Sequence, residues 1–320
     1  MSAAAARESG FEHPALFYAT ADEYLAATVP FIESALSMGE PVAAVVPTRN
    51  LTWLREALGS SSEKVLLMDM TEVGANPGAI IPTVLAALAG THVDRRMHII
   101  GEPIWPGRTE LEYPACAQHE ALVNRVFSAL PVEVLCPYDL SGLAPQVIAD
   151  AEATHSFLID RAGRRPSERY DPDRITADCN RPFEPAPKTA IERMADRATL
   201  DNARWFAVAY GRRVGLEPFQ LVDLEIALTE LLTNSVLHGG GVGTFRLWTD
   251  EAHLICEVSD AGHISDPLAG RLPVPEDQPH GRGLLLVNRI TDLVRMHTGP
   301  DGTTIRIYLR LGNVRSERAH

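Results

Sequence analysis

Three polar side chains recur every four residues in the stretch "ELLTNSVLHGG", residues 230–240. Glu230, Asn234 and His238 belong to a run that otherwise has the pattern of an amphipathic helix. At the helical repeat they drift by only about 80° around the axis, so they share one stripe. A carboxylate, an amide and an imidazole on one stripe could face a ligand, or they could be the solvated side of an ordinary helix.

A second motif follows in "SDAGH", where Asp260 ends a predicted strand and Gly262 comes two residues later. A carboxylate at this place can accept the exocyclic amino hydrogens of adenine. The glycine allows the backbone to approach a ring closely. The same pair of residues is also common in plain turns, so the motif alone does not decide between the two.

Two glycine motifs complete the series of polar features. In "HGRGLLLV", Gly281 and Gly283 precede a predicted helix whose free N–H groups could bind phosphate. In "DGTTI", Gly302 and Thr303 begin a predicted strand, and the hydroxyl could reach a base or its bound water. A simple β-turn is the alternative for this last motif.

The order of these motifs resembles the GHKL ATPase superfamily, which includes gyrase-type, histidine-kinase and anti-sigma-factor kinase ATP-binding domains. The resemblance covers about residues 189–312 and implies a two-layer α/β sandwich that binds ATP and Mg²⁺. Within the superfamily, the chain looks most like the small anti-sigma-factor serine kinases. Only a short stretch separates Asp260 from Gly281, and no helical pair bearing a phosphoacceptor histidine precedes the domain. His155 is the only histidine between the two halves.

The resemblance implies a role for each matching residue. Asn234 would supply an amide oxygen to Mg²⁺, which prefers oxygen ligands. Glu230 would orient or deprotonate the attacking hydroxyl. Asp260 would hold adenine with Gly262 beside it, and Thr303 would support that contact.

Gly281 and Gly283 would form the mobile phosphate lid, and the position of Arg282 between them suggests that it neutralises phosphate charge. His238 is expected to contact phosphate or to cap its helix, and we favour the cap. The sequence departs from the family at Ile264, where the first glycine box usually has a second glycine. This departure leaves phosphotransfer open.

The elements that must position these residues follow from the hydrophobic pattern of residues 189–312. A strand over "TAIERMADRA" and a helix ending near Gly215 precede the polar stripe. Two strands, a helix over "GLLLVNRITDLV" and an alternating strand over "TTIRIYLRL" follow it. We therefore expect a mixed sheet with helices on one face.

Residues 11–160 alternate short apolar runs with amphipathic helices. This pattern predicts a mostly parallel sheet with helices on both faces, a three-layer α/β domain. Pro30 lies inside the first predicted helix and is expected to kink or split it. Residues 161–188 are rich in Arg, Asp and Pro and are predicted to be a linker between the two domains.

Ligands of parallel sheets gather beyond the carboxyl ends of the strands. In residues 11–160 those ends carry "GEPIWPGR" and "CPYDL". The candidate pocket residues are therefore Glu102, Trp105, Arg108, Tyr138 and Asp139. A loop with a packing tryptophan and a turn is the alternative.

The same two motifs, together with "HPALFYATADEYLAATVPFIESALSMGEPVAAVVP", resemble the MEDS sensory domain, which is found fused to bacterial signalling outputs. The resemblance covers about residues 11–155, with three separated motifs in order. It implies a sensory or regulatory role for this half and an unknown small ligand. No phosphate-binding Gly-x-x-x-x-Gly-Lys motif follows "PVAAVVP".

Composition limits the classes of function that remain. The chain of 320 residues carries a formal net charge of −13, which argues against a nucleic-acid partner bound by a general positive field. No apolar stretch is long enough for a membrane span, and the first residues lack a signal peptide core, so a cytoplasmic location is expected. Four cysteines show no disulfide framework. A metal site at Cys116 and His119 with His92 and His98 is conceivable.

The sequence therefore predicts a bacterial signalling regulator that acts in transcription control. Its sensory half would govern an ATP-dependent serine kinase whose substrate is a small anti-anti-sigma-type protein. The alternative is a non-catalytic nucleotide-binding module that sequesters a sigma factor or another partner. A histidine kinase would require a phosphoacceptor such as His155. The oligomeric state stays open, with a homodimer as one option.

Overall fold

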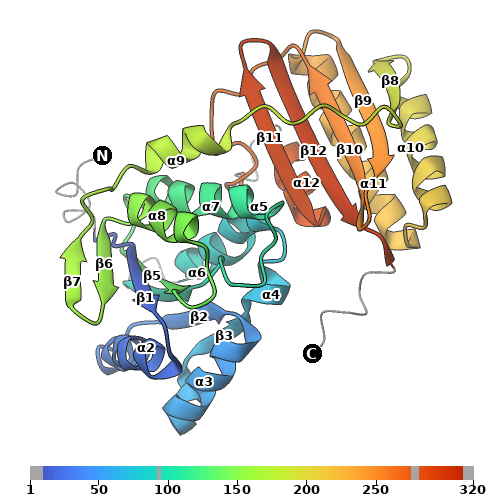
Figure 1. The fold of residues 1–320 in the computed structure, drawn as a ribbon. Helices are drawn as coiled ribbons and strands as arrows, with labels where there is room; N and C mark the ends of the chain where they lie inside the picture. Colours follow the sequence, from blue (N-terminus) through green and yellow to red (C-terminus); the bar gives the residue numbers. More distant parts are fainter. Residues whose placement is uncertain (1–9, 92–94, 275–280, 313–320) are drawn as a thin grey trace. The chain divides into compact units, whose positions relative to one another are not determined.

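The computed structural model describes residues 10–91, 95–274 and 281–312 of the chain (Figure 1). It divides the protein into two compact units, with the boundary between Cys179 and Asn180. The N-terminal unit is built on a seven-stranded sheet, and the C-terminal unit is built on a five-stranded sheet.

The N-terminal sheet has the strand order β3-β2-β4-β5-β1-β6-β7. All neighbouring strands are parallel except the β6–β7 hairpin. Strands β1, β2 and β4 are buried at every position, as expected for a parallel sheet covered on both faces. The bounds are β1 (Pro14–Tyr18), β2 (Val42–Val46), β3 (Leu66–Asp69), β4 (Met97–Gly101), β5 (Val132–Asp139), β6 (Phe157–Asp160) and β7 (Gly163–Pro166).

Helices cover the two faces of this sheet, which confirms the predicted three-layer architecture. Helices α2 and α3 share a core with one set of alternate strand residues. Helix α7 packs with α5, α8 and α9, on the opposite side of the sheet from α2 and α3 (Figure 1). The bounds are α2 (Ala21–Ser37), α3 (Thr48–Leu58), η1 (Gly59–Lys64), α4 (Met70–Val73), α5 (Pro77–Ile80), η2 (Ile81–Leu85), α6 (Ala86–Thr91), α7 (Tyr113–Val126), α8 (Pro145–Thr154) and α9 (Pro172–Cys179).

Two details of this unit differ from the sequence-based expectation. Helix α2 continues through Pro30 and is not split there, because the loss of one helical hydrogen bond is offset by the buried face of the helix. Residues 161–188 are not structureless, since they contain β7 and α9. Ile175 of α9 packs against Ala117 of α7 and Ala153 of α8. A helix with a single buried apolar residue gives almost no periodic signal, which explains the difference.

The C-terminal sheet has the order β11-β12-β10-β9-β8, with α10, α11 and α12 against one face (Figure 1). Every described pair of neighbouring strands is antiparallel, so the expectation of a mixed sheet was wrong. The two-layer α/β sandwich itself is confirmed. The bounds are β8 (Ile191–Asp196), α10 (Leu200–Val214), α11 (Pro218–His238), β9 (Val242–Thr249), β10 (His253–Asp260), α12 (Gly283–Ile290), β11 (Leu293–Gly299) and β12 (Gly302–Arg310).

The core of this unit lies between the sheet and its helices. Ile305, Ile307 and Leu309 of β12 point into it, as their alternation predicts. The sequence reading of "GLLLVNRITDLV" as one helix was wrong at its end. The helix stops at Ile290, and β11 begins at Leu293. Pairing of β11 with β12 buries Leu293 and overrides the helical pattern.

The other face of the same sheet carries a charged ladder across four strands. Glu192, Arg246, Glu257 and Arg306 occupy matched positions on β8, β9, β10 and β12. Arg246 donates to Glu257 at 2.9 Å, and Arg306 donates to the other oxygen of the same carboxylate at 2.6 Å. The ring of Phe183 covers the guanidinium of Arg306. These charge-assisted cross-strand bonds hold the polar face together.

Candidate functional site

A cavity of 680 Å³ lies beside the C-terminal half of α11, between this helix, the end of β10 and the start of α12. Its walls include apolar side chains from three elements: Leu231, Val258 and Ile305. Six of the eight predicted nucleotide-site residues also line it: Asn234, Asp260, Gly262, Gly281, Gly283 and Thr303. Motifs that lie far apart in the sequence therefore contribute residues to the same cavity.

Asp260 is held in place by hydrogen bonds to both of its carboxylate oxygens. Its Oδ1 accepts the backbone N–H of Gly262 at 2.7 Å, and its Oδ2 accepts the hydroxyl of Ser235 at 2.6 Å. Because a carboxylate oxygen has two acceptor directions, each oxygen can still accept a further hydrogen from a ligand. The half-buried carboxylate is therefore an oriented acceptor for an amino group in the cavity.

The C-terminal end of α11 lies directly against this aspartate. A Cβ placed on Gly239 would come within 2.3 Å of the carboxyl carbon of Asp260. The backbone N–H of Ala261 donates to the carbonyl of Gly239 at 3.2 Å. Only glycine permits this close approach, so the "HGG" that ends the helix sets the position of the Asp260 loop.

Thr303 stabilises the loop that follows Asp260, because its hydroxyl donates to the carbonyl of Gly262 at 2.9 Å. It also lies 2.9 Å from the hydroxyl of Thr298, which accepts the backbone N–H of Ile264 at 3.0 Å. Ile264 lines the cavity and packs against the core of the unit. Ile264, at the position where the resemblance leads one to expect a second glycine, is thus an apolar part of the cavity wall.

Glu230 is not among the described residues that line the cavity, although it lies close to the start of α12. A Cβ built on Gly283 would meet Oε2 of Glu230 at 2.6 Å and Nδ2 of Asn234 at 3.6 Å. Both side chains of the stripe therefore point toward the first residue of α12. The structure brings the carboxylate, the amide and the start of this helix together.

The two remaining polar candidates are Arg282 and His238, and both are exposed. Arg282 is exposed and is not one of the described lining residues. His238 is exposed, lines the cavity and is the last residue of α11. The helix is capped by Gly239, whose N–H bonds to the carbonyl of Ser235, so His238 is not the cap itself.

Sequence reasoning missed two residues that shape the site. Ser235 follows Asn234 on the buried side of α11, where it is fully buried. A small polar residue inside an apolar helical stripe was the available signal, because a buried hydroxyl needs a partner. Thr298 belongs to β11, which the sequence pattern did not reveal.

The five sensory candidates separate into distinct environments in the N-terminal unit. Glu102 is buried at the end of β4, where it accepts hydrogen bonds from Tyr18 at 3.0 Å and from Asn50 at 2.6 Å. Burial raises the pKa of Glu102 to about 8, although these two hydrogen bonds act in the opposite direction. Asp139, at the end of β5, pairs with Arg49 at 2.9 Å. A connected polar network therefore lies at the carboxyl ends of the strands.

Arg108 and Trp105 form a structural clamp. The guanidinium of Arg108 donates to the backbone carbonyls of Pro103, Ala75 and Gly74 and lies 4.0 Å from the ring centre of Trp105. Its donors are used within the protein, which favours the packing alternative for this loop. Tyr138 is buried, and its ring packs against the rings of Phe17 and His155.

The sequence suggested a metal site formed by Cys116, His119, His92 and His98, and the described residues do not form this group. His98 contacts Glu40 at 2.6 Å and Glu133 at 3.3 Å, and among the described residues it forms no ligand cluster with Cys116 and His119. His92 lies outside the described residues. His155 is completely buried, so its imidazole is not accessible as a phosphoacceptor in this fold.

Comparison with known families agrees with both halves of this picture. Residues 12–156 match the family model described as MEDS, the methanogen/methylotroph, DcmR sensory domain. Residues 194–309 match the family model of the histidine kinase-like ATPase domain. The chain therefore combines a MEDS-like sensory region with a histidine kinase-like ATPase region, which confirms both resemblances. An ATPase domain of this kind implies ATP binding.

The other comparisons add little. No curated protein matches the chain. The crystal structure of the RsbU and RsbW domains of Rv1364c from Mycobacterium tuberculosis is similar at 20% identity, with a TM-score of 0.29. That match covers 39% of this chain and only 33% of the other, and at this score it supports no conclusion about activity. Within the described ranges, no helix combines the length and hydrophobicity that a membrane crossing requires.

Proposed function

We propose that this protein is a signalling regulator in which the MEDS-like half controls an ATP-dependent serine kinase. Its substrate would be a small protein of the anti-anti-sigma type, through which the kinase would act on transcription. The observation that carries this proposal is the single cavity lined by Asn234, Asp260, Gly262, Gly281, Gly283 and Thr303. These are the residues that the resemblance to anti-sigma-factor kinases requires.

The donor set of the cavity fits a nucleotide with a magnesium ion. The oriented carboxylate of Asp260 suits the amino group of adenine, and the apolar side chains of Leu231 and Ile305 suit its ring. The amide of Asn234 is an oxygen donor of the kind that Mg²⁺ takes together with phosphate oxygens. ATP would supply the phosphoryl group that is transferred.

The protein itself would contribute positioning and charge. The Glu230 carboxylate lies beside the start of α12, where it would orient a serine hydroxyl and accept its proton. Gly281 and Gly283 would let the lid close over the phosphates, and Arg282 would approach them with it. In phosphoryl transfer such positioning and electrostatic stabilisation supply most of the rate.

The test is transfer of radiolabelled phosphate from ATP to purified partner proteins. We expect Glu230→Gln to lower the rate by about 10²-fold or more while ATP still binds. Equal labelling by the wild type and this variant would show that Glu230 is not the base. Thr229→Ala, on the same helix, is the control, because within the described part of the chain its hydroxyl bonds only to the carbonyl of Glu225.

Ile264 favours a second candidate function. In place of a glycine it puts an apolar side chain on the cavity wall and ties its own backbone to Thr298. A stiffer loop would suit a module that holds nucleotide and sequesters a sigma factor without phosphotransfer. Calorimetry with Mg-ATP separates the two, since tight binding without transfer to any partner supports sequestration.

A further inference from the structure

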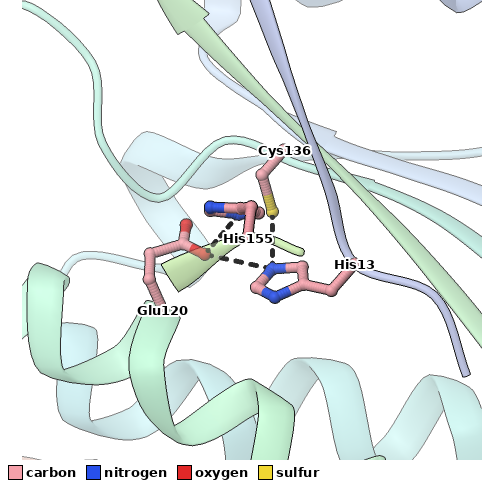
Figure 2. A group of neighbouring side chains, drawn as sticks. All are labelled: His13, Glu120, Cys136 and His155. Carbon is pink, nitrogen blue, oxygen red and sulfur yellow. Dashed lines mark hydrogen bonds and ion pairs between the residues drawn. The ribbon is translucent and has the colours of Figure 1, made fainter. Parts of the chain in front are cut away.

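Four side chains of metal-ligand type meet in the core of the N-terminal unit. His13 precedes β1, Glu120 lies in α7, Cys136 lies in β5, and His155 follows α8 (Figure 2). All are at most 2% exposed, and their potential ligand atoms lie within 4.8 Å of one another. The cluster has no part in the proposed kinase chemistry, and the sequence gives no hint of it.

Three of the separations between these atoms are close to those around a tetrahedral metal ion. Nε2 of His13 lies 3.2 Å from Oε2 of Glu120 and 3.3 Å from Sγ of Cys136. Nε2 of His155 lies 3.3 Å from the same oxygen of Glu120. Around a tetrahedral Zn²⁺ with bonds of about 2.0–2.3 Å, neighbouring ligand atoms are about 3.3–3.7 Å apart. In Figure 2, dashed lines join both imidazoles to the carboxylate of Glu120.

The hydrogen bonds around His13 fix which of its nitrogens faces the cluster as an acceptor. Its Nδ1 lies 3.2 Å from Oδ1 of Asn124. The amide nitrogen of Asn124 donates to the carbonyl of Thr154 at 2.8 Å, which sets the orientation of that amide. Nδ1 of His13 must therefore carry the proton, so Nε2 of the neutral ring directs its lone pair at Glu120 and Cys136.

His155 is arranged in the same way. Its Nδ1 lies 2.8 Å from the backbone carbonyl of Ala151, an acceptor that requires an N–H partner. In the tautomer with a single proton on Nδ1, the lone pair of Nε2 points at Glu120. A histidine that binds a metal usually donates its other N–H to a carbonyl or carboxylate in this manner.

With these tautomers, Nε2 of each histidine and the carboxylate oxygens of Glu120 face one another as hydrogen-bond acceptors. Both carboxylate oxygens of Glu120 and Nε2 of His155 are buried without a hydrogen-bond partner among the described residues. A buried carboxylate in this state is strongly destabilising unless a cation compensates it.

We propose that His13, Glu120, Cys136 and His155 bind one divalent transition-metal ion, with Zn²⁺ as the expected ion. Two imidazoles, a thiolate and a carboxylate suit its preference for nitrogen and sulfur ligands in tetrahedral geometry. Binding releases the thiol proton of Cys136 to solvent, so affinity rises with pH. With four protein ligands there is no open position, and the ion ties four separate segments together.

The experiment uses the full chain, stripped of metal with a chelator and titrated with Co²⁺. We expect saturation at one equivalent, with the strong visible absorption of tetrahedral Co²⁺ and a thiolate-to-cobalt charge-transfer band. Zn²⁺ should displace the Co²⁺ and abolish both signals. Failure of the wild-type chain to bind Co²⁺ with a thiolate band overturns the proposal without any variant.

Variants identify the ligands. Cys136→Ser should lose the charge-transfer band, whereas Cys116→Ser, a matched change at another buried cysteine of this unit, should keep it. A band that survives in Cys136→Ser contradicts the assignment. Glu120→Gln keeps the shape of the side chain and should retain the thiolate band with at least about tenfold weaker binding. Unchanged affinity in this folded variant would remove Glu120 from the site and overturn the four-ligand proposal.

Discussion

Ser235 donates a hydrogen bond of 2.6 Å to Oδ2 of Asp260, which joins the buried side of α11 to the end of β10. The helix that carries Glu230 and Asn234 is thereby fixed relative to the proposed adenine acceptor. Because Gly239 also packs against Asp260, the helix end and the loop form one rigid corner of the cavity. A nucleotide that enters the cavity would therefore meet an acceptor that is already oriented, which lowers the ordering cost of binding.

Removing either partner of this bond should weaken nucleotide binding. We expect Asp260→Asn to cost about 1–3 kcal/mol, or roughly fivefold to 150-fold in affinity, since the amide replaces one acceptor oxygen with a donor. Ser235→Ala should cost less, because the carboxylate remains. Calorimetry with Mg-ATP measures both, and Thr229→Ala provides the control. An Asp260→Asn protein with wild-type affinity would rule out the adenine role.

Gly283→Ala should lower the rate of phosphotransfer without lowering the stability of the fold. Its new Cβ would lie 2.6 Å from Oε2 of Glu230, so the flexible carboxylate must move. We expect phosphotransfer to fall at least about tenfold, as for a misplaced catalytic group, while the melting temperature holds or rises slightly because alanine favours the helix.

The matched control is Gly90→Ala in α6, where a Cβ meets no atom within 4 Å. Phosphotransfer and thermal unfolding should be measured on both variants. If Gly283→Ala transfers phosphate as fast as Gly90→Ala, the position of the Glu230 carboxylate beside Gly283 does not affect catalysis.

Glu102 should make the N-terminal unit less stable as pH rises. Burial raises its folded-state pKa to about 8, from an ordinary value of 4.5, so the folded state binds the extra proton between these values. Its contribution to stability is complete below about pH 4.5 and is lost as pH rises through about 8. The slope should approach about 1.4 kcal/mol per pH unit in this window.

Glu102→Gln should flatten that dependence, since the amide does not titrate. Hydrogen exchange of peptides from residues 10–179 reports this unit separately from its neighbour. A mutant with the same pH dependence as the wild type would show that another group is responsible.

Arg246 of the charged ladder pairs with two carboxylates, one buried and one exposed, so the stabilisation that each provides can be compared. The Glu257 side chain is 5% exposed and bonds to both Arg246 and Arg306, whereas the Glu192 side chain is 56% exposed. We expect Glu257→Gln to destabilise the C-terminal unit by about 1–3 kcal/mol, because it leaves two guanidinium groups poorly paired. Glu192→Gln should cost at most about 1 kcal/mol. Urea unfolding of both variants checks the difference, and equal losses would contradict the importance of burial.

Local pattern was sufficient for much of the architecture and for the outline of the kinase-like site. Alternation in β12 and helical spacing in α11 depend only on which face is buried, and that information lies in neighbouring residues. The order and spacing of the motifs likewise pointed to Asn234, Asp260, Gly281 and Gly283, which line one cavity. Helix α9 and strand β11 escaped prediction, because their stability comes from contacts with α7 and β12 rather than from their own periodicity.

The sequence by itself therefore determined the two α/β units and the residue types around the cavity. Only the tertiary structure decided which side chains meet, as with Ser235 and Asp260, or His13 and Cys136, which stand 123 positions apart. The physical reason is that periodicity records burial, whereas the pairing of distant segments depends on sheet order and packing. A buried histidine and a buried cysteine look ordinary in sequence until the fold brings their ligand atoms to one point.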